Sequence, residues 1–130
     1  MDWTLVLIVG GAVAVVFLLK RMSFVSAKVA RKHLAEGALV IDVRSPEEFR
    51  GGKVPGAVNL PLGEIRAKIG EVAKDKQQPL LVHCLSGGRS AIGKQQLKSL
   101  GYANVFNLGS LRRAQRIFAE AKQRRAVPET

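Results

Sequence analysis

The residues of this chain best able to do chemistry lie in one short segment, from Leu80 to Ser90. An apolar run ends there at Cys84, the only cysteine, and is followed by two glycines and Arg89. A cysteine between the end of a strand and the start of a helix lies where backbone N–H groups converge and the helix dipole is positive. That setting favours the thiolate, which is the nucleophilic form. The sequence therefore predicts a reactive, exposed cysteine rather than a small apolar core residue.

A second polar group lies at the end of another apolar stretch. Residues 39–43 have the pattern of a buried strand that contains Asp42 and leads directly into Arg44. Strand ends are where α/β folds place ligand-facing groups. A buried carboxylate and a guanidinium group usually pair, so we expect Asp42 and Arg44 to form a structural ion pair near the cysteine. We expect Glu48 to pair with Arg44 or with a nearby backbone N–H group.

The two segments together resemble the rhodanese family of sulfurtransferases. In single-domain members the active-site loop has a cysteine, four loop residues and then Arg-Ser, as in the segment from Cys84 to Ser90. The stretch from Asp42 to Pro61 also matches, with Asp-Val-Arg, an acidic-aromatic pair and Pro-Gly-Ala. The resemblance covers about residues 24–120. It implies an α/β fold with a mainly parallel β-sheet flanked by helices on both faces.

The same resemblance implies a chemistry for the loop. The Cys84 thiolate would take the outer sulfur of a sulfane donor such as thiosulfate or a persulfide, and a thiol or cyanide would accept it. No metal or organic cofactor would be needed. Lys53 stands where the family usually has histidine and Ala114 where it usually has tryptophan, so the shape of the pocket rim differs. The residues that would hold the persulfide are Leu85, Ser86, Gly87, Gly88, Arg89 and Ser90.

Two other functions fit part of this pattern. Cysteine-dependent phosphatases, some on the same fold, have five residues between cysteine and arginine, and the extra residue admits a phosphate group. The four residues between Cys84 and Arg89 therefore favour sulfur transfer. Rhodanese-like domains can also serve as docking modules for a partner, but docking alone does not require the intact Cys84. Neither His83 nor His33 is expected to assist the cysteine, because His83 points to the opposite face of its strand and His33 lies in a charged, solvated pattern.

The first part of the chain has the composition of a membrane anchor. Residues 3–19 contain no charged side chain, and these 17 residues would span about 26 Å as a helix, at the short end of what crosses a hydrocarbon core. Interfacial Trp3 and the Lys20-Arg21 pair could cover the shortfall. A signal peptide is disfavoured, because Asp2 precedes the apolar run and no Lys or Arg does.

The flanking charges predict how this anchor is oriented. Lys20, Arg21 and three further Lys or Arg residues up to position 32 follow the apolar run. The positive-inside rule then places the amino terminus outside and the domain in the cytoplasm of a single-pass inner-membrane protein. One cysteine forms no internal disulfide, which agrees with a reducing compartment. A membrane-protein partner for the anchor is a further possibility.

Charge and patterning divide the chain into three parts: a transmembrane anchor over 1–21, a rhodanese-like domain over 22–125 and a flexible tail over 126–130. From residue 20 onward the chain carries all 21 Lys and Arg and nine of the ten Asp and Glu, a net charge of +12. That charge suits an anionic membrane leaflet and anionic sulfur compounds. Nucleic-acid binding is not expected, since no recognised motif or set of stacking aromatics is present.

Periodicity and cap residues predict the elements of the domain. Ser26 is a helix N-cap, and Gly37 ends the same helix. Continuous apolar strands alternate with helical patterns, which predicts a mainly parallel sheet. The predicted strands cover 39–43, 57–60, 80–83 and 105–108, and the predicted helices cover 26–36, 62–72, 90–100 and 111–125.

Overall fold

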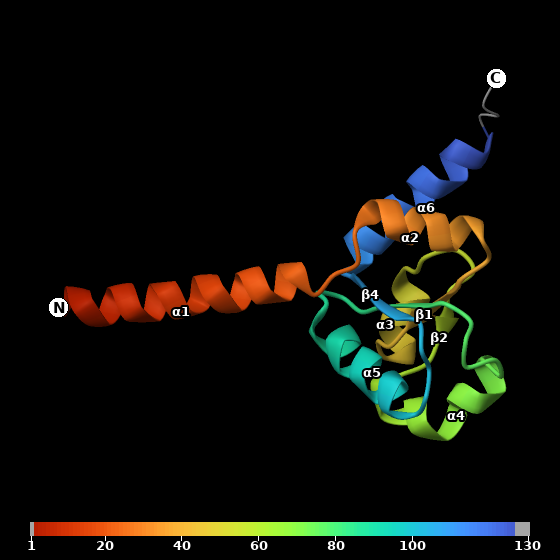
Figure 1. Cartoon of the computed structure of the whole chain (residues 1–130), viewed down its shortest axis with the longest axis horizontal. Coiled ribbons are helices and arrows are strands. Elements are labelled where there is room, and N and C mark those ends of the chain that lie inside the picture. Colours follow the sequence, from red (N-terminus) through yellow and green to blue (C-terminus); the bar gives the residue numbers. More distant parts are fainter. Residues whose placement is uncertain (1, 127–130) are drawn as a thin grey trace.

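The structure, a computed structural model, describes residues 2–126 and has an α/β arrangement from which one long helix projects (Figure 1). The helix that projects is α1, and the other helices pack on the two faces of a parallel sheet. In chain order the elements are α1 (Trp3–Met22), α2 (Ala27–Ala35), β1 (Leu39–Asp42), α3 (Pro46–Gly51), β2 (Val58–Asn59), the 3₁₀ turn η1 (Leu62–Glu64), α4 (Ile65–Val72), β3 (Leu80–His83), α5 (Gly88–Ser99), β4 (Val105–Gly109) and α6 (Leu111–Ala126).

The sheet has four parallel strands in the order β2-β1-β3-β4. Alternate strand residues point to opposite faces, so each central strand contributes to two apolar layers. Leu80 and Val82 pack in the layer that α4 and α5 cover, and Leu81 packs in the layer that α2 and α6 cover. The predicted parallel sheet with helices on both faces is therefore confirmed. Because all strands run the same way, their carboxyl ends meet at one edge, where β3 leads into Cys84.

Local capping explains where two of the helices start. The Ser26 side chain accepts a hydrogen bond from Val29 N at 3.2 Å, as predicted for the start of α2. Helix α3, which we did not predict, also starts at a serine. Ser45 Oγ accepts from Glu48 N while Glu48 Oε1 accepts from Ser45 N, both at 3.2 Å, and Pro46 occupies the first turn. This capping box was visible in the sequence as Ser-Pro-Glu-Glu.

Helix α1 lies apart from the sheet and its covering helices (Figure 1). Its large apolar side chains from Trp3 to Leu19 are each at least 45% exposed. Within residues 2–126, no helix combines the length and the apolar character needed to cross a membrane. The predicted transmembrane anchor is thus not confirmed. The uncharged run of 17 residues is about 26 Å long as a helix, several ångströms less than a hydrocarbon core.

Two smaller expectations are corrected by the structure. Ala126, placed by the sequence in a flexible tail over 126–130, is the last residue of α6, and residues 127–130 lie outside the described part of the chain. His33, expected to be solvated, is half-buried and stacks on Phe106, with 4.6 Å between ring centroids. The apolar side of α2 packs against the sheet, and His33 extends that side.

Candidate active site

The loop after β3 is held in place by hydrogen bonds to the segment that joins β4 to α6. Cys84 N donates to Gly109 O at the end of β4, at 3.2 Å, and Leu111 N donates to Leu85 O at 3.3 Å. The chain then turns at Gly87, whose φ of 102° lies in the left-handed region that favours glycine. This turn carries the chain directly into α5, so the sulfur of Cys84 lies near the amino terminus of that helix.

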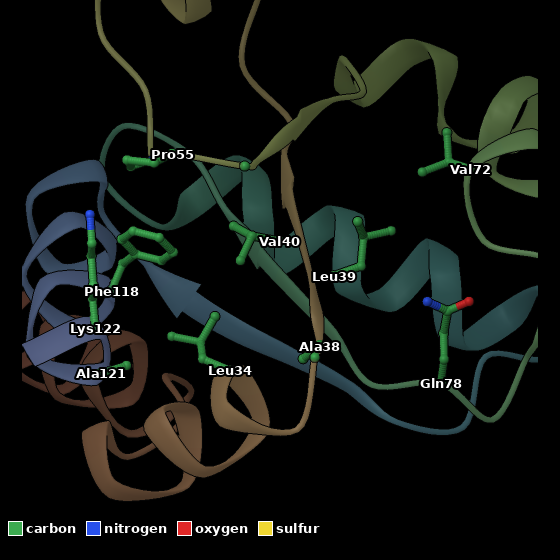
Figure 2. Close-up of a pocket in the computed structure, with 12 residues that line it drawn as sticks. Leu34, Ala38, Leu39, Val40, Pro55, Val72, Gln78, Phe118, Ala121 and Lys122 are labelled. Carbon is green, nitrogen blue, oxygen red and sulfur yellow. The ribbon is translucent and has the colours of Figure 1, made fainter. Parts of the chain in front are cut away.

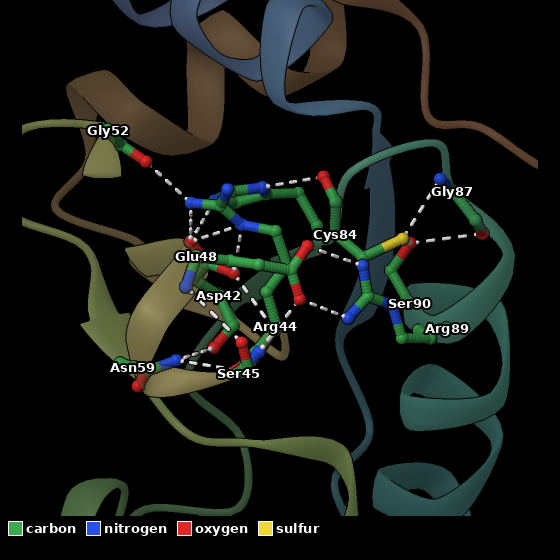
Figure 3. Close-up of polar contacts among 11 residues, drawn as sticks. Asp42, Arg44, Ser45, Glu48, Gly52, Asn59, Cys84, Gly87, Arg89 and Ser90 are labelled. Atoms are coloured by element: carbon green, nitrogen blue, oxygen red, sulfur yellow. Dashed lines mark hydrogen bonds and ion pairs between the residues drawn. The ribbon is translucent and has the colours of Figure 1, made fainter. Parts of the chain in front are cut away.

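Polar groups of the loop converge on the sulfur of Cys84 (Figure 3). Gly87 N donates to Cys84 Sγ at 2.9 Å. The Ser90 hydroxyl lies 3.5 Å from the same sulfur. Backbone N–H groups of Ser86 and Ser90 also bond to it. Three backbone N–H groups and, at longer range, one hydroxyl of the same loop therefore meet at one atom, which is the arrangement that stabilises a sulfur anion.

Cys84 is nevertheless buried, with 1% of its surface exposed, so the expectation of an exposed cysteine is wrong. The sulfur packs in the apolar layer between the sheet and α5. Burial raises the pKa of the Cys84 thiol, but the hydrogen bonds from Ser90, Gly87 and Ser86 outweigh it, so the pKa lies below its ordinary value. An inert core cysteine would lack these donors and would have a raised pKa. The hydrogen bonds of the loop thus favour the thiolate of Cys84 despite its burial.

Asn107 of β4 fixes the active-site loop through hydrogen bonds to its residues. Its Oδ1 accepts from Ser90 Oγ at 2.7 Å and from Gly109 N at 2.9 Å, and its Nδ2 donates to Gly87 O at 3.3 Å. Its side chain is fully buried. Sequence reasoning missed this residue, because an asparagine inside an apolar strand indicates a supporting role only when the residues that it contacts in the fold are known. Asn107 fixes Gly87 and Ser90, two of the three residues whose groups reach the sulfur.

Arg89 does not point at the sulfur as an isolated charge. Its guanidinium forms a bidentate pair with Glu48 of α3, at 2.6 and 2.9 Å (Figure 3). The Arg89 hydrogen bond lowers the pKa of Glu48 to about 2, against a smaller effect of burial. Glu48 thus pairs with Arg89 and with the backbone of Ser45, and not with Arg44. The pair ties α3 to the start of α5.

Asp42 and Arg44 form the buried ion pair that the sequence predicted. Arg44 Nε and Nη2 donate to the two oxygens of Asp42 at 2.7 to 3.0 Å, and the two side chains are 0% and 3% exposed. Arg44 Nη2 also donates to Gly52 O at 2.6 Å. His83 is fully buried, and burial lowers its pKa more than nearby Asp42 raises it. These three residues support the loop from β1 and β3 and do not contact the sulfur.

The structure brings together only part of the predicted binding loop. The backbone or hydroxyl groups of Ser86, Gly87 and Ser90 reach the sulfur of Cys84. Leu85 instead extends its side chain outward, 54% exposed, and Gly88 is the first residue of α5. The site residues that the sequence named but that do not contact the sulfur are Leu85, Gly88, Arg89, Asp42 and Arg44.

A cavity of about 370 Å³ lies at the opposite end of the sheet from Cys84. Figure 2 shows Phe118 and Lys122 of α6 on one side of it, with Val72 and Gln78 on the other. Leu39 and the other lining residues come from the amino ends of the strands and the helices beside them. No residue of the cysteine loop lines it.

Comparison with known proteins agrees with this geometry. The chain is 39% identical over 72 residues to the thiosulfate sulfurtransferase PspE of Escherichia coli strain K12, a match covering 55% of this chain and 69% of that protein. It is 38% identical over 71 residues to the uncharacterised protein YqhL of Bacillus subtilis, covering 55% of each. The chain thus spans about half to two thirds of the length of these curated relatives.

Solved structures give the same result. The chain resembles a rhodanese with anions from E. coli, with a TM-score of 0.58 and 36% identity over 59% of this chain and 91% of that one. It also resembles the human single-domain sulfurtransferase TSTD1, with a TM-score of 0.60 and 31% identity over 70% of this chain and 93% of that one. The family model for the rhodanese-like domain matches residues 26–112. On the parallel sheet, the cysteine loop and these matches together, the chain belongs to the rhodanese-like family.

Proposed function

We propose that this protein is a sulfurtransferase that carries sulfur as a persulfide on Cys84. The Cys84 thiolate attacks the outer sulfur of a donor such as thiosulfate. The sulfur–sulfur bond of the donor breaks, sulfite leaves with the electron pair of that bond, and Cys84 holds the transferred sulfur. A thiolate or cyanide then attacks the outer sulfur, takes it as a persulfide or thiocyanate, and releases the Cys84 thiolate. Such a two-step displacement has ping-pong kinetics.

One observation carries this proposal: N–H groups and a hydroxyl of the loop meet at the sulfur of Cys84 and lower its pKa although it is buried. They are held by the fold before the reaction starts, so they stabilise the anionic sulfur without reorganisation. The family membership and the relatives named as sulfurtransferases support the same reaction.

The test is to load the purified protein with thiosulfate and measure its intact mass. The wild-type chain should gain one sulfur atom, and cyanide should remove it with release of thiocyanate. Cys84→Ala should gain nothing. A wild-type protein that gains no sulfur, or a Cys84→Ala variant that gains as much, would refute the proposal. Absence of turnover with a phosphate ester in the same preparation would exclude a phosphatase.

The burial of Cys84 favours one second candidate, a docking module that recruits a partner and has weak catalysis or none. The two candidates predict different results for Cys84→Ser, which keeps the shape of the loop. A docking module keeps its role in the cell with this variant, whereas a sulfurtransferase loses it, provided that the variant accumulates at the same place and level as the wild type.

We also propose that α1 attaches the domain to the inner membrane, with the domain on the cytoplasmic side. The uncharged run over 3–19, its exposed apolar side chains and the net charge of +12 after it support this placement. The full chain should remain with the membrane fraction after an alkaline wash, and added protease should cleave the domain in inverted vesicles but not in intact spheroplasts. Recovery of the chain in the wash would refute the attachment.

A further inference from the structure

We infer that the active-site loop faces the membrane surface to which α1 is attached and lies against anionic lipid headgroups. This inference rests on the proposed attachment of α1. It adds that the active-site loop and the origin of the anchor lie on the same side of the domain.

The first step is the position of Phe24, in the segment that follows α1. The Phe24 ring lies against the active-site loop: a Cβ placed on Gly87 would be 2.5 Å from it, and one on Gly109 would be 3.1 Å from it. Gly87 is the residue whose N–H group donates to the sulfur of Cys84. The residue that leads out of α1 therefore packs directly on the active-site loop.

This segment is fixed to the domain by further contacts. Val25 N donates to Asn107 O at 2.8 Å, and Phe24 forms a parallel bridge with Asn107 beside β4. The Arg113 guanidinium lies 5.6 Å from the centroid of the Phe24 ring and donates to Val25 O and to Leu108 O, the latter at 2.7 Å. Phe24 thus belongs to the folded domain and does not depend on the direction that α1 takes.

The second step is the reach of the chain. Helix α1 ends at Met22, and Phe24 follows two residues later. Two residues span at most about 7 Å, so the end of α1 stays within that distance of Phe24 whatever its angle to the domain. Figure 1 shows the loop between β3 and α5 reaching the point where α1 leaves the domain. A bilayer that holds α1 up to its end therefore lies close to the loop.

The third step is the chemistry of the surface around this point. Outside α1, the large apolar side chains exposed in the described part of the chain are Val29, Leu85 and Ile92. Leu85 belongs to the loop itself and is 54% exposed, and Ile92 lies near the start of α5 and is 52% exposed. Exposed apolar residues next to a basic surface are typical of proteins that lie on a membrane.

The basic part of this surface is a groove of about 270 Å³ beside α1 and α5. Lys94 and Lys98 line it one helical turn apart, so their like charges repel each other. Anionic headgroups would relieve that repulsion and gain attraction from each lysine. The other residues that line the groove are Ser23, Ala91, Gln95 and Asn107.

The experiment measures how close each end of the domain comes to lipid. In a Trp3→Phe background, which removes the only native tryptophan, one variant of the full chain carries Leu85→Trp and a matched one carries Lys74→Trp. Lys74 is exposed and follows two residues after Val72, which lines the cavity at the far end of the sheet (Figure 2). Both are reconstituted into anionic vesicles whose lipids carry bromine close to the headgroup.

The tryptophan fluorescence of Leu85→Trp should be quenched at least about twofold more than that of Lys74→Trp. A surface at the membrane interface lies close enough to the bromine atoms for quenching, and the far end of the domain does not. Ile92→Trp, which lies outside the loop, should behave as Leu85→Trp does and replaces it if that variant misfolds. Lys94→Gln combined with Lys98→Gln should reduce the quenching at Leu85→Trp, whereas Lys68→Gln combined with Lys74→Gln should leave it unchanged.

Equal quenching at the two ends, or stronger quenching at Lys74→Trp, would overturn the inference. In the otherwise native chain, quenching of Trp3 reports insertion of α1, and its absence would overturn both the attachment and this inference. Thiocyanate release from thiosulfate and cyanide, followed in the same vesicles without the tryptophan substitutions, tests sulfur transfer separately. A failure of the orientation is therefore distinguishable from a failure of the proposed reaction.

Discussion

At the scale of single residues, the balance at Cys84 is between burial and hydrogen bonding. Burial among apolar side chains disfavours the thiolate, and the donors of the loop favour it. The donors outweigh burial only because several of them point at the same atom. The Ser90 hydroxyl is the one side-chain group among those that lower the pKa of Cys84, so it can be removed without changing the backbone.

Ser90→Ala should raise the pKa of Cys84 and slow sulfur loading. A hydrogen bond to a charged group contributes about 1.5–3 kcal/mol, so the loading rate at neutral pH should fall by about tenfold or more. The pH dependence of alkylation by iodoacetamide measures the pKa directly. Ser99→Ala, on the same helix but far from the loop, should change neither quantity. An unchanged alkylation profile for Ser90→Ala would show that its hydroxyl stays bonded to Asn107 instead.

The Glu48–Arg89 pair should stabilise the fold in a pH-dependent way. The pKa of Glu48 is lowered from 4.5 to about 2 in the folded protein, so its stabilisation is fully present above pH 4.5 and is lost as the pH falls through 2. Glu48→Gln keeps the size of the side chain and should cost about 1 kcal/mol near neutral pH, as expected for a partly exposed pair.

Urea unfolding of both proteins at several pH values measures this difference, which should shrink between pH 4.5 and 2. Glu47→Gln, which removes the neighbouring and more exposed carboxylate, is the control and should have little effect at any pH. A cost of Glu48→Gln that is equally large at pH 2 and pH 7 would mean that the ion pair is not its cause.

At the scale of elements, the active-site loop and the segment after α1 are parts of one packed unit. Gly87 needs a positive φ, and the Phe24 ring occupies the space where its side chain would lie. Gly37 also has a positive φ but has open space around it. The two glycines therefore separate the cost of backbone conformation from the cost of the Phe24 contact.

Gly37→Ala should lose about 1 kcal/mol, from the left-handed backbone alone. Gly87→Ala should lose clearly more, because its Cβ would lie 2.5 Å from Phe24. Adding Phe24→Ala to Gly87→Ala should recover part of that loss although Phe24→Ala alone is destabilising. Chemical unfolding of the full chain in mild detergent gives the four values. Strict additivity of the two substitutions would rule out the contact as the source of the extra cost.

The elements also show what a sequence can and cannot predict here. The spacing of Cys84, the caps at Ser26 and the apolar strands depend on local pattern, and the corresponding helices and strands are confirmed. The burial of Cys84 depends on how the loop folds over it, and the roles of Asn107 and Phe24 depend on partners distant in the chain. Helix α3 was missed although its capping box is a local pattern, because its six residues are too few to show a helical periodicity of apolar side chains.

At the scale of the whole molecule, the chain carries a net charge of +11, and the sulfur donors proposed for its active site are anions. At low ionic strength, this positive charge should attract an anionic reagent and raise its rate of reaction with Cys84 relative to that of a neutral reagent. The ratio of the alkylation rates with iodoacetate and with neutral iodoacetamide measures this, with free cysteine as the reference.

The ratio should exceed that of free cysteine in dilute buffer and fall toward it as salt is raised to about 1 M, where the screening length is about 3 Å. A ratio that does not change with salt would show that the charge of the molecule does not act at the site. Neutral iodoacetamide should react at nearly the same rate throughout.

The contact between Phe24, Val25 and β4 has a consequence for the solubility of shortened chains. β4 is the outermost strand on its side of the sheet, and its outer edge at the middle residue, Asn107, is bonded by Val25 instead of being left open. Open strand edges pair readily with strands of other molecules. A truncation made just after Val25 to remove the apolar helix would uncover this edge and invite strand-to-strand aggregation, whereas one made just before Ser23 would keep the edge closed.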